Sequence, residues 1–343
     1  MKLYEIIIKP ESGFGTPLKG DTIFGHFCWQ ASYNPSLLNG GLEKWMACYG
    51  KRPFAVFSSA YPKIKKDGVM YYAFKRPDYP PDRLFQSTEQ NRKKALEQKK
   101  DNLKKKRLLV SEDLLIFLSA DKFISDEEML AIAFRELTGQ TKKAMRKKTS
   151  RQFMTEFIQP HNTINRATMT TGGGMFAPFS ESAEFYYPET ELAVLILLDE
   201  EATDIGRVTA AMERIGQVGF GRNASTGGGR FTLGEQEEKK LPFNASADAC
   251  YTLSPAIPEK GLYKDCWFTP FTRFGRHGDV LAVSKNPFKN PVIMADEGAV
   301  FLPADRSVFS LPYLGCAAFN VSKALSGAVT QGYSIYLPFK LEN

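Results

Sequence analysis

Residues 219–233 read GFGRNASTGGGRFTL, and five of the first eleven residues are glycine. A turn needs one or two glycines, whereas this density indicates that the backbone itself must come close to another part of the molecule or to a ligand. Polar side chains that can meet an anion stand between the glycines: Arg222, Asn223, Ser225, Thr226 and Arg230. The stretch therefore predicts a tightly folded loop with polar side chains that can bind an anion.

The residues on either side of this loop predict a helix before it and a strand after it. Ile205, Val208, Met212 and Ile215 recur at steps of three and four residues, as on one face of a helix. Thr203 or Asp204 is the expected N-terminal cap, and Gly216 is the expected C-terminal glycine. This context excludes the dinucleotide fingerprint, because that motif follows a strand and opens a helix. The P-loop is excluded because no Gly-Lys-Ser/Thr ends the motif.

The rest of the first two thirds of the chain extends this pattern to β-α-β-β-α-β. We predict strands at 1–10, 53–62 and 192–198 and a helix within 19–32. This is the ferredoxin-like order of an α+β domain spanning 1–240. A large irregular insertion at about 63–150 and an extended hairpin at about 155–182 interrupt it. The strand-rich remainder, 241–343, is predicted to form a second ferredoxin-like domain.

Composition bounds the class of protein. The chain has 343 residues, of which 43% are hydrophobic and 24% charged, as in ordinary soluble domains. No apolar run approaches the roughly 20 residues that cross a bilayer, and residues 1–10 do not resemble a signal peptide. The five cysteines include no C-x-x-C pair. We therefore expect a cytoplasmic protein with reduced thiols, no membrane contact and no zinc site.

The positive charge is concentrated in two segments. The formal net charge is +7, yet residues 92–107 alone carry +7 and residues 142–151 carry +6, which leaves −6 on the remainder. Basic segments on a mildly acidic body suit a polyanion, most often nucleic acid. A solvated helix and loop that only aid solubility is the alternative interpretation.

Several stretches together resemble one family. Gly219-x-Gly221, five residues and Gly227-x-Gly229 resemble the glycine-rich loop of the RAMP superfamily of CRISPR proteins. KGDTIFGHFCW (19–29), HNTINRATMTTGGGMF (161–176) and TQGYSIYLPFKL (330–341) resemble the first helix, hairpin and closing strand of the fourth subunit of type III-A Csm effector complexes. The resemblance covers most of the chain, and the basic insertion is its least covered part.

The resemblance implies a function and a set of partners. Such subunits bind the 5′ repeat-derived tag of the guide RNA and cap one end of the complex, without nuclease activity. They dock the large polymerase-palm subunit and the first backbone subunit, and they meet target RNA indirectly. We expect the RNA-binding residues to be Gly219, Gly221, Arg222, Asn223, Ser225, Thr226, Gly227, Gly229 and Arg230 in the loop, His161, Asn162, Asn165 and Arg166 in the hairpin, and Lys19, Thr22 and His26 at the first helix. The loop has no lysine, so Arg222 and Arg230 are the candidates for that contact.

Other functions stay open on the sequence. A metal-independent endoribonuclease of the same superfamily would need a general acid or base, commonly histidine. The three histidines, His26, His161 and His277, have no obvious acid–base partner in sequence, so we expect no catalysis. A scaffold that binds only protein, and the equivalent capping subunit of a sister type III complex, are further alternatives. No acidic cluster with metal-ligand spacing stands out, so we expect no metal and no cofactor.

Overall fold

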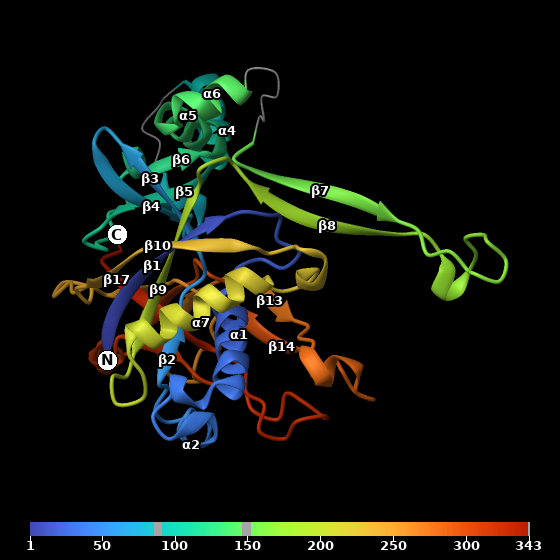
Figure 1. Ribbon diagram of the computed structural model, residues 1–343. Helices are drawn as coiled ribbons and strands as arrows, with labels where there is room; N and C mark the ends of the chain where they lie inside the picture. The colour runs from blue at the N-terminus through green and yellow to red at the C-terminus, as the bar shows by residue number, and fades with distance from the viewer. Residues whose placement is uncertain (86–90, 146–151, 342–343) are drawn as a thin grey trace.

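The computed structural model describes residues 1–85, 91–145 and 152–341, and it is an α+β protein, as predicted. An eight-stranded antiparallel sheet forms the centre, a five-stranded sheet packs beside it, and a two-stranded arm projects away from both (Figure 1). Within the described ranges, no helix combines the length and the apolar character that crossing a bilayer requires.

The N-terminal unit follows the predicted order of elements. Its strands are β1 (Lys2–Pro10), β2 (Ala55–Phe57), β9 (Glu191–Leu198) and β10 (Phe231–Lys239), and its helices are α1 (Gly20–Tyr33) and α7 (Ile205–Val218). The strands lie in the order β10-β1-β9-β2, with α1 between β1 and β2 and α7 between β9 and β10. The helix η1 (Pro35–Leu37) and α2 (Gly41–Cys48) follow α1. With the insertion set aside, this is the arrangement that the β-α-β-β-α-β pattern requires.

Helix α7 differs from its prediction at the C-terminal end. Asp204 caps its start by accepting a hydrogen bond from the Arg207 amide at 3.0 Å, but the helix runs on to Val218 rather than ending at Gly216. A Cβ on Gly216 would lie 2.2 Å from the Phe231 carbonyl oxygen. Gly216 is therefore needed so that α7 can lie against β10, and Gly219, with φ of +110°, ends the helix.

The predicted insertion continues the central sheet. Its strands are β3 (Tyr61–Lys66), β4 (Val69–Lys75), β5 (Lys105–Ser111) and β6 (Phe123–Ser125), and its helices are α3 (Pro81–Leu84), α4 (Arg92–Lys104), η2 (Ala120–Lys122), α5 (Asp126–Glu136) and α6 (Gly139–Met145). Strand β9 pairs with β2 near its C-terminal end and with β3 near its start. The Ser58 hydroxyl accepts a hydrogen bond from the Leu195 amide at 2.8 Å where β2 leaves the sheet.

Only part of the predicted basic surface can be placed. Helix α4 carries most of the first basic run, and none of its residues is buried. The second run begins in α6, but its residues 146–151 lie outside the described residues. The described cations of α4 therefore form a solvent-facing surface. Such a surface is expected both for binding to nucleic acid and for a solvated helix that only aids solubility.

The predicted hairpin is a long projecting arm. Strands β7 (Met154–His161) and β8 (Phe179–Tyr186) pair from Met154 with Tyr186 to His161 with Phe179. Residues 162–178, including the short helix η3 (Gly174–Phe176), form its tip, well away from the body in Figure 1. Since the arm pairs only with itself beyond its base, it presents both faces to solvent.

The C-terminal region does not follow the predicted ferredoxin-like order. Its strands are β11 (Ala249–Thr252), β12 (Tyr263–Trp267), β13 (Pro270–Arg273), β14 (Val292–Ala295), β15 (Val300–Pro303), β16 (Tyr313–Gly315) and β17 (Tyr333–Phe339). The described residues from 241 to 341 contain the short helices η5 (Asp279–Val283) and η6 (Arg306–Ser310) but no α-helix. The inner face of β11 and β17 enters the same core as the N-terminal strands, which provide the cover that helices would otherwise supply. The domain boundary at residue 240 stays a prediction.

Ion pairs attach helix α1 to the C-terminal region. The Lys19 ammonium lies 2.5 Å from the Asp296 carboxylate and 2.6 Å from that of Glu297, and these side chains are 12%, 18% and 17% exposed. Asp21, in the first turn of α1, accepts two hydrogen bonds from the Arg273 guanidinium at 2.5 and 2.8 Å. Lys19, expected at an RNA interface, thus has its charge balanced within the protein.

We predict that Lys19→Met lowers the free energy of unfolding by about 3 kcal/mol, because it leaves two mostly buried carboxylates without their cation. Urea denaturation at pH 7 measures this change. Lys51→Met is the control, since Lys51 is exposed and makes no ion pair with a described residue, and it should change stability by less than about 0.5 kcal/mol. Equal stability of the two variants would contradict the proposed attachment.

Candidate nucleic-acid interface

The glycine loop, residues 219–230, is folded tightly on itself. Gly219, Gly221, Gly227 and Gly229 all have positive φ, at +110°, +71°, +91° and +68°. A Cβ on Gly229 would lie 2.2 Å from the Phe220 carbonyl oxygen, and one on Gly221 would lie 2.5 Å from the Thr16 side chain. Most of these glycines are thus required by the packing of the loop itself.

The loop packs against a segment that the sequence analysis did not single out, Ser12–Thr16. The Gly229 amide donates to the Gly13 carbonyl at 2.8 Å, and the Arg230 amide donates to the Ser12 hydroxyl at 2.8 Å. Phe14 and Phe220 are both 1% exposed, with ring centroids 6.4 Å apart. The signal in the sequence was the tripeptide Gly-Phe-Gly, which occurs at 13–15 and again at 219–221.

The same segment joins the loop to the base of the arm. Phe14 and Glu184 of β8 exchange backbone hydrogen bonds of 2.9 Å each. The Arg222 guanidinium donates to the Ser182 carbonyl oxygen at 2.6 Å, and the Arg222 amide donates to the Thr16 hydroxyl at 2.9 Å. The glycine loop and the base of the arm are therefore held in one fixed arrangement.

His26 holds the glycine loop on helix α1. Its Nε2 accepts a hydrogen bond from the Gly221 amide at 3.2 Å, and its ring lies 4.5 Å from the ring of Phe220. Burial lowers the pKa of His26 to about 4, so the imidazole is neutral near pH 7. Thr22, also predicted at this interface, lies one turn earlier on α1 and is half-buried.

One side of the glycine loop remains free to bind a ligand. The side chains of Arg222, Ser225, Thr226 and Arg230 are exposed. Three backbone amides at the start of helix η4 (Ala224–Thr226) donate to no described residue, and they belong to Asn223, Ala224 and Ser225. The other amides of the loop donate to acceptors within the protein. Guanidinium groups and free amides are the donors that phosphate oxygens accept from.

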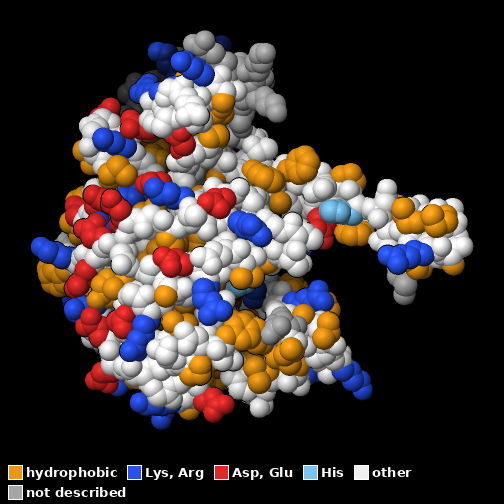
Figure 2. All heavy atoms as spheres, viewed as in Figure 1, with side chains coloured by type: hydrophobic (Ala, Val, Ile, Leu, Met, Phe, Trp, Pro, Cys, Tyr) orange, Lys and Arg blue, Asp and Glu red, His pale blue; other side chains and the backbone are white. Residues whose placement is uncertain are grey.

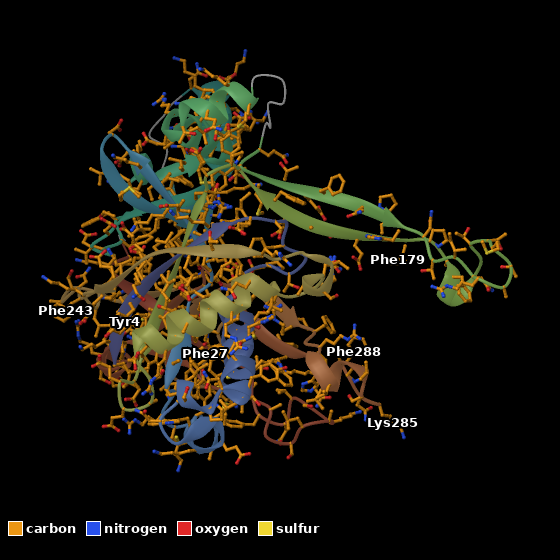
Figure 3. All side chains as sticks on the ribbon, viewed as in Figure 1. Tyr4, Phe27, Phe179, Phe243, Lys285 and Phe288 are labelled. Carbon is orange, nitrogen blue, oxygen red and sulfur yellow. The ribbon has the colours of Figure 1, made fainter. Side chains whose placement is uncertain are left out.

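The hairpin candidates lie at the outer half of the arm, away from the glycine loop. The His161 ring stacks on Phe179, which is labelled on the arm in Figure 3, with centroids 5.2 Å apart. The His161 Nε2 lies 3.8 Å from Glu181. The Asn165 side chain accepts a hydrogen bond from the Ala167 amide at 2.9 Å and so shapes the tip. Asn162 and Arg166 are exposed. The predicted residues thus fall into two surfaces and do not form a single site.

Apolar side chains line the arm between these two surfaces, as the orange atoms in Figure 2 show. Phe157, Ile158, Phe179 and Phe185 are 42–61% exposed, and Met169 at the tip is 77% exposed. Aromatic side chains beside basic groups can stack on the bases of single-stranded nucleic acid. The arm therefore offers stacking surface, and the glycine loop offers phosphate contacts.

A carboxylate cluster that the sequence analysis missed lies within the central sheet. The carboxylates of Glu5, Glu112 and Glu237 come within 4.8 Å of one another, which within the described ranges is the only group of three possible metal ligands this close together. Lys63 lies 3.0 Å from Glu5 and 2.7 Å from Glu112, and Lys239 lies 2.7 Å from Glu237. Two lysines thus already supply the positive charge that a metal ion would bring.

No family model matches the chain, and no curated protein matches it either. Solved structures do. A chain of the Csm1–Csm4 cassette in complex with pppApA matches with a TM-score of 0.55 and 16% identity, over 100% of this chain and 98% of that one. A chain of the Csm3–Csm4 subcomplex of the type III-A CRISPR-Cas interference complex matches at 0.55 and 15%, over 99% and 100%.

Csm4 is the subunit that these two complexes share. The chain has a Csm4-like fold. At this level of identity the similarity establishes the fold, and it confirms at that level the resemblance drawn from the glycine loop, the first helix, the hairpin and the closing strand. The Csm4-like fold includes the whole described chain, and the insertion strands and the arm are parts of it.

We predict that His26 makes stability depend on pH. Because its folded-state pKa of about 4 lies below the ordinary value of about 6.5, its contribution is complete above pH 6.5 and is lost as the pH falls toward 4. The wild type should therefore lose about 2 kcal/mol more than His26→Gln between pH 7 and pH 4.5.

Urea denaturation of both proteins at the two pH values measures this difference, in which the titration of the other groups cancels. Parallel losses in the wild type and the variant would contradict a buried neutral imidazole that holds the loop.

Proposed function

We propose that the chain is a non-catalytic RNA-binding subunit of a type III-A CRISPR effector complex that binds the 5′ repeat-derived tag of the guide RNA. The observation that carries this proposal is the free side of the glycine loop. There Arg222 and Arg230 stand beside three backbone amides that have no acceptor among the described residues. The Csm4-like fold supports the same assignment.

The chemistry of the loop suits a single-stranded RNA backbone. Single-stranded RNA is bound by phosphate contacts that fix its register and by stacking on unpaired bases. Because the loop is fastened to Ser12–Thr16, to His26 and to the arm, its donors are fixed in position before the ligand arrives. A preorganised site loses less conformational entropy on binding than a mobile loop would.

The proposed protein partners follow from the solved complexes. Csm4 occurs there with Csm1 and with Csm3. We propose that this chain likewise docks a large polymerase-palm subunit and a backbone RAMP subunit, and that target RNA reaches it indirectly. The equivalent capping subunit of a sister type III complex is the alternative that this fold also suits.

The surroundings of the histidines favour a binding role over catalysis. His26 uses its Nε2 to accept from the Gly221 amide, His161 lies on the arm, and the buried His277 lies 2.6 Å from the Ser322 hydroxyl. The three rings therefore belong to separate places and assemble no shared acid–base site.

Incubation of the purified protein with precursor RNA should give no cleavage, and cleavage abolished by His26→Ala would favour the endoribonuclease instead.

We predict that Arg222→Ala combined with Arg230→Ala weakens binding of a single-stranded guide RNA about 10- to 100-fold at 0.1 M salt, because two charge-assisted phosphate contacts are lost. The slope of the logarithm of affinity against the logarithm of salt concentration should fall by about 1.4. Fluorescence anisotropy at several salt concentrations measures both quantities.

The matched control is Lys51→Ala combined with Lys65→Ala, which removes the same charge at two exposed side chains that make no ion pair with a described residue. Lys51 follows α2, and Lys65 lies on β3. Thermal melting should be unchanged in the lysine variant and should fall by only a few degrees in the arginine variant, which also loses the hydrogen bond from Arg222 to the Ser182 carbonyl oxygen. Equal loss of RNA affinity in the two would mean that net charge and not the glycine loop is responsible.

A further inference from the structure

A cavity of about 540 Å³ opens where the base of the arm meets the central sheet. It is lined by residues 17–19, 59–62, 75–76, 78, 103, 106–107, 126 and 297, together with residues 153–154, 184 and 186 at the base of the arm. No residue of the glycine loop lines it. Its volume lies in the range of small-ligand sites, about 300–1,000 Å³, so it can enclose one nucleotide unit.

Two side chains without partners face this cavity from strand β8. Glu184 and Tyr186 are alternate residues of one strand, so they lie on the same face of it. Neither the Glu184 carboxyl nor the Tyr186 hydroxyl makes a hydrogen bond with a described residue. Burial raises the pKa of both groups, and Glu156, opposite Glu184 on β7, adds to the shift of the carboxyl. The cavity thus holds a carboxyl and a hydroxyl that make no hydrogen bond with a described residue, although Lys19 and Arg107 act against the rise in the pKa of the carboxyl.

The positive groups of the cavity divide into engaged and free ones. Lys19 and Lys75 pair with Asp296 and Asp78, and the Arg76 guanidinium donates to backbone carbonyls at 3.3 and 3.5 Å. The exposed Lys106 makes no ion pair with a described residue, and Arg107 has only a 3.5 Å contact to Asp126. The cation whose side chain has no ion pair or hydrogen bond to a described residue is therefore Lys106, and Arg107 beside it has only the contact with Asp126.

Apolar side chains complete the walls. Leu103, which is 45% exposed, and Met154 line the cavity together with Tyr61. A flat aromatic base can pack against such walls, while its edge meets Glu184 and Tyr186. A phosphate deep in the cavity is disfavoured, because Asp78, Asp126, Glu184 and Glu297 also line it.

We propose that this cavity holds one unstacked base of the bound RNA, and that it selects a base with an exocyclic amine. The amine of adenine, cytosine or guanine donates to the Glu184 carboxylate, and the adjoining phosphates meet Lys106 and Arg107 at the mouth. Uracil presents carbonyl oxygens where an amine is needed, and a carboxylate repels them. The inference rests on the proposed function and names a base-selective subsite within it.

The test measures binding of labelled eight-nucleotide RNAs to the full-length protein. The wild type should bind oligo(A) and oligo(C) about 10- to 100-fold more tightly than oligo(U), which is the effect expected of one hydrogen bond to a charged acceptor. An oligomer of N6,N6-dimethyladenosine, which keeps the purine ring but lacks the amine hydrogens, should bind as weakly as oligo(U). This ligand-side control does not depend on the folding of any variant.

The protein variants separate this subsite from the glycine loop. Glu184→Gln should bring the oligo(A) to oligo(U) ratio to within twofold, since an amide can donate as well as accept. Arg222→Ala with Arg230→Ala should weaken both oligomers equally and leave the ratio unchanged. Binding without base preference in the wild type, or a preference that survives Glu184→Gln, would overturn the subsite alone. Absence of binding to every oligomer would overturn the proposed function as well.

Discussion

The structure around the proposed interface depends on how closely the backbones of Phe220 and Gly229 approach each other. Only a residue without a Cβ fits at position 229, where the φ of +68° also excludes most side chains. This approach closes the glycine loop and turns Phe220 inward, where its ring meets Phe14 and His26. Once Phe220 is buried, Arg222 and Arg230 are left on the outside. The glycines therefore act mainly by folding the loop, and its arginines and free amides follow from that fold.

Strand β9 lies at the centre of the main sheet, with other strands paired to both of its edges. It is buried along almost its whole length and pairs with β1 on one edge and with β2 and β3 on the other. The arm strand β8 ends at Tyr186, only a few residues before β9 begins at Glu191. The arm is consequently joined to the start of a buried central strand, and Figure 1 shows it leaving the body beside the central sheet.

The sequence was informative where local pattern decides the structure. The stripe on α7, the Asp204 cap and the hairpin could all be predicted, because each depends on residues that are close in the chain. Gly216 was assigned wrongly, since its role is a contact with Phe231 from another element. Glu184 and Tyr186 carry no signal until the register of β7 and β8 is known. The C-terminal helices were expected because cover from the N-terminal unit cannot be seen in a strand pattern.

Net charge is a poor guide to where a polyanion would meet this protein, because many of its charges neutralise each other internally. Lys63 and Lys239 are used by the cluster of Glu5, Glu112 and Glu237, and Lys19 is used by two further carboxylates. Since free charges are screened beyond about 10 Å at 0.1 M salt, a polyanion responds to nearby unpaired cations rather than to the total. Near the proposed RNA-binding surfaces, these cations are the exposed arginines of the glycine loop and the last residues of the first basic run, which lie beside the cavity. The two segments are distant in sequence, and the base of the arm lies beside both. Ser182 accepts a hydrogen bond from Arg222, and Glu184 and Tyr186 line the cavity together with Lys106 and Arg107.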